Sequence, residues 1–124
     1  MKRLLLVLLL LVCPAYAFAV SVDDVTITTM VSERAPVDRI EIYPAQQGKL
    51  YCFTQVEGAT AETSIEHIWL YHGREMARVS LPVRSAKWRT YSSKKIVPEW
   101  TGDWEVVVVD AVGGELARGK FRVE

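Results

Sequence analysis

Apolar and polar residues alternate along much of this 124-residue chain. The clearest runs are Val25 to Val31, Val79 to Val83, and Gly119 to Val123. A period of two places every second side chain on one face of an extended strand, so each run predicts a half-buried β-strand. No segment after the first nineteen residues shows a convincing helical stripe. We therefore expect an all-β fold.

Four further strands are expected where β-branched and aromatic residues gather, at Leu50 to Val56, Ser64 to Tyr71, Lys87 to Lys95 and Trp104 to Asp110. Glycine and proline mark the turns between the expected strands, at Pro44 to Gly48, Glu57-Gly58, His72-Gly73, Pro98 to Gly102 and Gly113-Gly114. About seven short strands at this spacing predict a single antiparallel β-sandwich of immunoglobulin-like type. Pro82 cannot donate to a ladder, so we expect it on an edge strand or at a bulge.

The N-terminus has the pattern of a secretory signal peptide. Lys2 and Arg3 precede the apolar run Leu4 to Val12, and the small-residue site Ala15-Tyr16-Ala17 follows. The run is too short to span a bilayer, so we expect no membrane span in the mature chain. We predict a leader over residues 1–19, cleaved after Ala17 or Ala19, and one periplasmic or extracellular domain over residues 20–124.

Two alternatives to a cleaved leader stay open. One is an uncleaved membrane anchor, which the shortness of the apolar run disfavours. The other is lipidation at Cys13, although Val12 stands where a lipoprotein signal favours a small residue. If Cys13 leaves with the leader, Cys52 is the only mature cysteine and no intramolecular disulfide can form. We expect Cys52 to be buried, with an intermolecular disulfide or a nucleophile as the alternatives.

The mature chain is nearly neutral. Removing Lys2 and Arg3 from the 15 basic residues leaves 13 against 15 acidic ones, a formal net charge of −2. This balance and the expected export disfavour nucleic acid as a partner.

A set of short motifs resembles the bacterial domain-of-unknown-function 2914 family. The motifs are Tyr51-Cys52-Phe53-Thr54, His67-x-Trp69-x-x-x-Gly73, Leu81-Pro82-Val83, Trp88 to Lys94, Thr101-Gly102-x-Trp104-x-Val106-x-Val108, and Phe121. They cover the chain from about Val25 to the C-terminus. The resemblance implies a compact extracytoplasmic β domain and implies no established activity.

Catalytic and metal-binding patterns are weak. His67 and His72 are five residues apart, which places them on opposite faces of a strand, and too few further ligands are present for a zinc site. Cys52 with His67 is the only nucleophile and base pair worth naming, and an expected buried thiol argues against it. We therefore expect no enzyme activity, no metal and no cofactor.

The candidate binding residues are aromatic or basic. Trp104 and Trp88 are expected in the core, whereas Trp100, in a turn, and Tyr91 are the best exposed aromatic candidates. From Arg74 to Lys95 there are seven basic residues against Glu75 alone, which predicts a positive strip across two strands. A solvated face that is complemented by acidic residues elsewhere is the simpler alternative. The candidate binding site is Arg89, Tyr91, Lys94, Lys95 and Trp100.

The leading functional hypothesis is a non-catalytic module that binds a protein partner or assembles in the cell envelope. The alternative is a module that binds an envelope glycan or another anionic polymer through Trp100, Tyr91 and Arg89. An exposed row of aromatic rings around Trp100 would favour the glycan. Self-association is a further hypothesis, with Val25 to Val31 as the edge strand that could pair.

Overall fold

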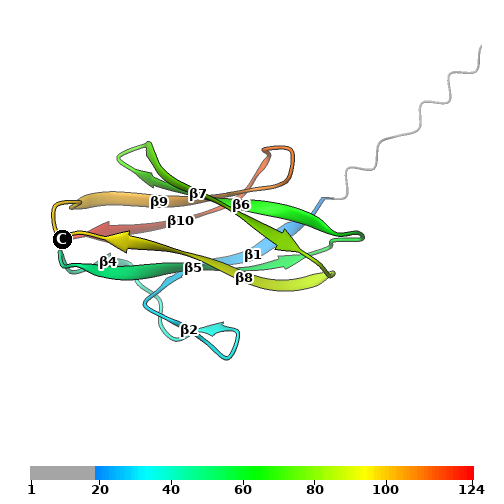
Figure 1. Cartoon of the computed structure of the whole chain (residues 1–124), viewed down its shortest axis with the longest axis horizontal. Helices are drawn as coiled ribbons and strands as arrows, with labels where there is room; N and C mark the ends of the chain where they lie inside the picture. The colour runs from blue at the N-terminus through cyan, green and yellow to red at the C-terminus, as the bar shows by residue number, and fades with distance from the viewer. Residues whose placement is uncertain (1–18) are drawn as a thin grey trace, which may run out of the picture.

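Strands and the turns between them make up nearly all of residues 19–124, which are the residues that this computed structural model describes (Figure 1). The expected leader up to Phe18, with its cleavage motif and Cys13, lies outside these residues. In the described part, no helix is long and apolar enough to cross a membrane. The prediction of an all-β fold is confirmed.

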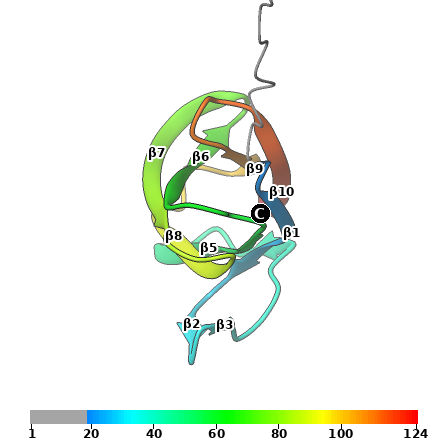
Figure 2. The ribbon, with the colours of Figure 1, turned by 90° about the vertical axis from the view of Figure 1, so that its right-hand side faces the viewer.

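Two sheets and a small hairpin form the molecule. The smaller sheet has the antiparallel order β1 (Ser21–Thr28), β5 (Gly48–Glu57), β8 (Lys87–Ile96). The larger sheet has the order β4 (Ile42–Tyr43), β10 (Glu115–Val123), β9 (Gly102–Val109), β6 (Thr63–Tyr71), β7 (Arg74–Val83). The hairpin pairs β2 (Val31–Ser32) with β3 (Ala35–Pro36). Seen along the strands, the two sheets face each other, and the hairpin projects from the smaller sheet on the side away from the larger one (Figure 2).

Each run that the sequence predicts as a strand overlaps one of the long strands, and the predicted turns fall between them or at their ends. Pro82 lies on β7, an edge strand of the larger sheet, as expected. The turn between β6 and β7 is His72-Gly73, where both residues have positive φ, 48° and 77°. Two such residues form the turn whose twist suits a two-residue hairpin.

The run Val25 to Val31 is not one strand, which corrects the sequence prediction. β1 ends at Thr28, and Val31 begins the separate hairpin. The cause is Asp38, whose carboxylate accepts hydrogen bonds from the Thr28 hydroxyl at 2.6 Å and from the Thr29 amide at 2.8 Å. These bonds turn the chain out of the sheet.

One strand pair is parallel, which the sequence analysis missed. β4 lies beside the end of β10, with Ile42 opposite Arg122 and Tyr43 opposite Val123. A strand of two residues has no readable period, so the alternation of apolar residues could not predict it. The larger sheet is therefore mixed rather than purely antiparallel.

The main core lies between the sheets. Trp104 is 1 % exposed, as predicted, and its ring stacks on Phe121 with the centroids 5.7 Å apart. Cys52 is fully buried in the same cluster, which confirms that prediction. Trp88 keeps part of its surface exposed and packs against a second apolar cluster.

β1 and β10 approach each other closely on one side of the molecule. A Cβ atom added to Gly119 of β10 would lie 2.7 Å from Cγ1 of Val25 in β1. β1 is one of the two edge strands of its sheet, as the self-association hypothesis requires. However, Val25 packs on Gly119, and the carbonyl of Ile27 already accepts the amide of Ile40 at 2.8 Å. The chain itself therefore covers part of this edge.

Candidate functional site

A buried polar cluster joins the two sheets. His67 of β6 has no exposed surface, and its Nδ1 lies 2.6 Å from the Ser92 hydroxyl of β8 and its Nε2 3.1 Å from the Thr54 hydroxyl of β5. Trp69 donates its indole N–H to the same Ser92 oxygen at 3.1 Å. Thr54 in turn donates to the carbonyl of Thr90 at 3.3 Å.

The bonds of this cluster fix the protonation state of His67. Ser92 accepts from Trp69, which leaves its own hydrogen for Nδ1 of His67. Thr54 donates to Thr90, so it accepts from Nε2–H of His67. The neutral Nε2–H tautomer of His67 therefore satisfies the hydrogen-bonding groups of every residue in the cluster. Burial lowers the pKa of His67 to about 4.

The cluster is structural. A serine beside a histidine is the arrangement of an activated nucleophile, but catalysis requires access for a substrate. Ser92 is 5 % exposed and His67 is fully enclosed. Cys52 forms no hydrogen bond with His67 among those found in residues 19–124, and burial raises the pKa of its thiol. His72 lies in an exposed turn, so the two histidines do not share a site.

The outer face of the larger sheet is neutralised by its own ion pairs. Arg78 contacts Glu66 and Glu75, and Arg118 contacts Glu105 and Glu115. Arg122 likewise pairs with Asp103 and Glu124. The positive charges on this face are therefore locally balanced.

The outer face of the smaller sheet differs. Alternation along β8 places Arg89, Tyr91 and Lys95 on this face, in register with Gln55, Phe53 and Lys49 of β5. Within residues 19–124, none of its cations Lys49, Lys87, Arg89 and Lys95 is in a salt bridge. This face therefore carries positive charge that no ion pair of the described chain neutralises.

The centre of this face is a patch of two tyrosines and two lysines. Tyr91 is 50 % exposed, and its ring meets the edge of Tyr51 at 5.9 Å between centroids. Lys49 places its ammonium 5.9 Å from the centroid of Tyr51, and Lys95 lies directly across from Lys49. We call Lys49, Tyr51, Tyr91 and Lys95 the tyrosine–lysine patch.

A pocket adjoins the patch where the β2–β3 turn approaches β8. Its volume is about 480 Å³, and its wall consists of Arg34, Gln55, Ser85, Lys87, Trp88 and Arg89. One guanidinium nitrogen of Arg89 donates to the carbonyl of Arg34 at 3.2 Å. We call this cavity the arginine pocket.

The structure divides the predicted site. Arg89, Tyr91 and Lys95 share the outer face of β8, whereas the Lys94 side chain belongs to the opposite face with Trp88, Ser92 and Ile96. The Lys94 ammonium lies 4.6 Å from the centroid of Trp100, and partial burial lowers the pKa of Lys94.

Trp100 is not the exposed platform that its turn position suggested. It packs against the main core, 5.8 Å from the ring of Trp104, whose indole N–H donates to the Trp100 carbonyl at 3.1 Å. Trp100 keeps part of its surface exposed. Trp100 and Lys94 therefore stand apart from the tyrosine–lysine patch.

The predicted positive strip is also interrupted. Arg78 is held by Glu66 and Glu75, and Arg84 lies 3.6 Å from Glu62. The alternative of a face complemented by acidic residues therefore holds for β7 and the turn after it. Sequence reasoning missed Lys49, Tyr51 and Arg34, and the first two could have been found from their alternation along the strand that begins near Leu50.

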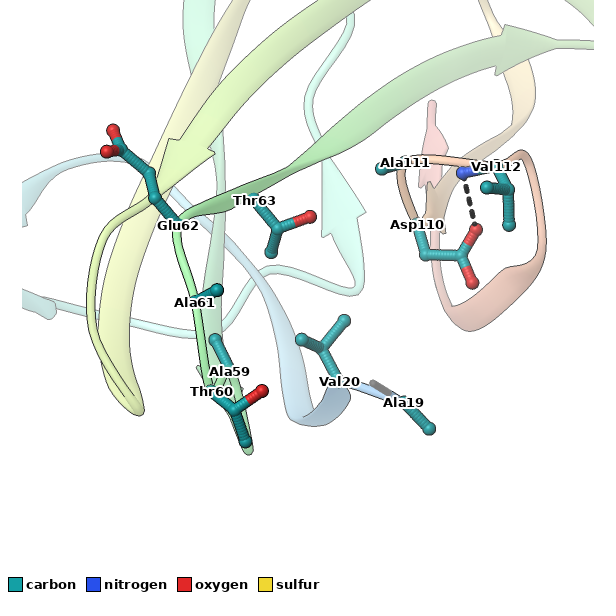
Figure 3. Close-up of a pocket in the computed structure, with 10 residues that line it drawn as sticks. All are labelled: Ala19, Val20, Ala59, Thr60, Ala61, Glu62, Thr63, Asp110, Ala111 and Val112. Carbon is teal, nitrogen blue, oxygen red and sulfur yellow. Dashed lines mark hydrogen bonds between the residues drawn. The ribbon is translucent and has the colours of Figure 1, made fainter. Parts of the chain in front are cut away.

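A second cavity, of about 330 Å³, lies at the end of the molecule where the described chain begins (Figure 3). Small side chains such as Ala59, Ala61 and Val20 form much of its wall, and Val112 from the β9–β10 turn lies across from them. Among residues 19–124, the charged residues in its wall are Glu62 and Asp110.

Comparison with known proteins gives one family match. A family model described as "Protein of unknown function (DUF2914)" matches residues 62–123. None of the curated proteins matches the chain. The match covers β6 to β10 in full, and it includes Tyr91 and Lys95 of the patch.

Proposed function

We propose that the mature form of this chain, which belongs to the DUF2914 family of proteins of unknown function, is a non-catalytic binding module. We propose further that it is exported to the periplasm or the extracellular space. Its partner is a protein with an acidic surface, and its docking site is the tyrosine–lysine patch. The fold that we propose for it is an immunoglobulin-like sandwich of seven principal strands. Two facing sheets with long antiparallel strands support this assignment.

The observation that carries the proposal is the difference in charge pairing between the two outer faces. Arg78, Arg118 and Arg122 on the larger sheet each contact two carboxylates. Lys49 and Lys95 face each other across β5 and β8, where like charges opposite one another cost stability. A carboxylate from a partner would relieve this repulsion, which argues for an acidic ligand.

The aromatic geometry favours a protein over a glycan. Trp100 is packed against Trp104, and the rings of Tyr51 and Tyr91 meet at an interplanar angle of 67°. These rings do not form the flat row on which sugar rings would stack. An exposed tyrosine on a rigid sheet is a residue type that is enriched at protein interfaces, and the lysines beside it supply the charge that would select an acidic partner.

The test is an NMR titration of the mature protein with a poly-glutamate peptide. We expect the amide shifts to concentrate on β5 and β8 around Tyr91. Replacing Lys49 and Lys95 together by glutamine is expected to weaken binding roughly threefold to tenfold, because each exposed charge contributes up to about 1 kcal/mol. Added salt should act in the same direction, since exposed charges are screened over about 8 Å at physiological ionic strength.

Lys120→Gln is the matched control, because Lys120 is an exposed lysine on the larger sheet, 3.6 Å from Glu105. This variant should bind the peptide as the original protein does. Equal weakening by Lys120→Gln would show that only net charge matters, and would contradict the assigned site. If a polyuronate shifts the Tyr91 region and the peptide does not, the partner is an anionic glycan and the protein assignment is wrong.

A further inference from the structure

The arginine pocket collects positive charge from two parts of the chain. Arg34 comes from the β2–β3 turn, and Lys87 and Arg89 come from the outer face of β8. Its wall contains no carboxylate, and in the described chain none of these three side chains is in a salt bridge. Glu57, opposite Lys87, accepts the side-chain amide of Gln55 at 3.1 Å. The pocket therefore presents several unpaired donors to one cavity.

The turn that brings Arg34 to the pocket has an unusual backbone. Glu33 and Arg34 have φ angles of 52° and 61°, in the left-handed region that residues other than glycine rarely adopt. The carbonyl of Arg34 accepts one Arg89 nitrogen, which ties the hairpin to β8. Two successive residues of this kind form the turn of a two-residue hairpin, as at His72-Gly73. The contact with Arg89 keeps two guanidinium groups beside the same cavity.

We propose that the arginine pocket binds a phosphate or sulfate group carried by a small molecule or by a polymer end. Arginine forks match the oxygen geometry of these anions and make charge-assisted hydrogen bonds to them. The volume of about 480 Å³ lies within the range of small-molecule sites, so the pocket holds more than a bare ion. This site lies outside the tyrosine–lysine patch and goes beyond the proposed protein partner.

The test is isothermal titration of the mature protein with glucose 1-phosphate, inorganic phosphate, inorganic sulfate and glucose. We expect saturable binding of the anions, tightest for glucose 1-phosphate, and no binding of glucose. If inorganic phosphate binds as tightly as glucose 1-phosphate, the pocket recognises the anion alone and the inference of a carried group is wrong. If glucose binds, or if no anion shows saturable binding in the millimolar range, the site assignment falls.

Arg34→Gln is the decisive variant. It removes a charge from the pocket but keeps the backbone carbonyl that Arg89 contacts, so the hairpin stays attached. Loss of one charged hydrogen-bond donor should weaken glucose 1-phosphate binding roughly tenfold or more. Lys87→Gln should act in the same direction, and Lys120→Gln should leave binding unchanged. Unchanged affinity in Arg34→Gln and Lys87→Gln would overturn the proposal.

The outcomes separate this site from the proposed function. Poly-glutamate binding that survives Arg34→Gln, with glucose 1-phosphate binding lost, supports two sites. If none of the anions binds in the titration, the proposal that the arginine pocket is an anion site is wrong. The tyrosine–lysine patch is then tested by the poly-glutamate titration alone.

Discussion

The hydroxyl oxygen of Ser92 lies 2.6 Å from Nδ1 of His67, between two sheets and out of reach of solvent. The contact links β8 of the smaller sheet to β6 of the larger one. Because Trp69 and Thr90 fix the direction of the surrounding bonds, His67 is held neutral. A proton added to Nδ1 would turn an acceptor into a donor and leave the Ser92 hydrogen without its partner.

The first prediction is acid destabilisation through His67. Its pKa is about 4 in the folded protein, against an ordinary value of 6.5. The stabilisation is present above pH 6.5 and is lost as the pH falls through the folded pKa, because the unfolded chain takes up the proton first. Over that window the free energy of unfolding should fall by about 3 kcal/mol, at 1.36 kcal/mol for each unit of pKa difference.

Urea unfolding between pH 7 and pH 5 checks this prediction, since ordinary carboxyl groups titrate below that range. His67→Gln should flatten the pH dependence in the same window. If this variant does not fold, an NMR titration of the His67 ring in the original protein replaces it. A midpoint near 6.5 for that ring would contradict the enclosed, neutral histidine.

The second prediction concerns Trp104, which is 1 % exposed between Phe121 and Tyr71. Trp104→Ala should cost about 3 to 5 kcal/mol, a large part of the stability of a domain this small. Thermal unfolding followed by circular dichroism measures the loss. Tyr91→Ala is the control, because Tyr91 is half exposed and its removal should change stability little. An unchanged melting temperature in Trp104→Ala would show that Trp104 is not part of the core.

The third prediction tests the contact between β1 and β10. Gly119→Ala should cost about 1 to 3 kcal/mol, because the new Cβ would lie 2.7 Å from Cγ1 of Val25. Val25→Ala should recover part of that loss in the double variant, since it frees the same space. The free energies of unfolding of the original protein, the two single variants and the double variant form a double-mutant cycle that measures the coupling between the two residues. Strictly additive losses would show that the two residues do not touch.

The strands could be predicted because each of the long strands packs against the core on one face, and that half-burial gives alternation. The course of the chain after Thr28 could not be predicted, because it depends on hydrogen bonds to Asp38, ten residues further along the sequence. The same limit applies to Trp100, whose partial burial depends on its contact with Trp104 of β9. The alternation along β8 puts Arg89, Tyr91 and Lys95 on one face, whereas Lys94 has the opposite parity and belongs to the other face.

The most direct test of the binding surface is photo-crosslinking in the native host, with a photoreactive phenylalanine in place of Tyr91 or of Ile42. The two positions are 50 % and 59 % exposed, and Ile42 lies on β4 of the larger sheet, away from the patch. We predict one discrete protein adduct from position 91, with an acidic segment at the crosslinked site, and its loss when Lys49 and Lys95 are glutamine. Equal adducts from both positions, or none from position 91 with adducts from position 42, would contradict the assignment of the tyrosine–lysine patch.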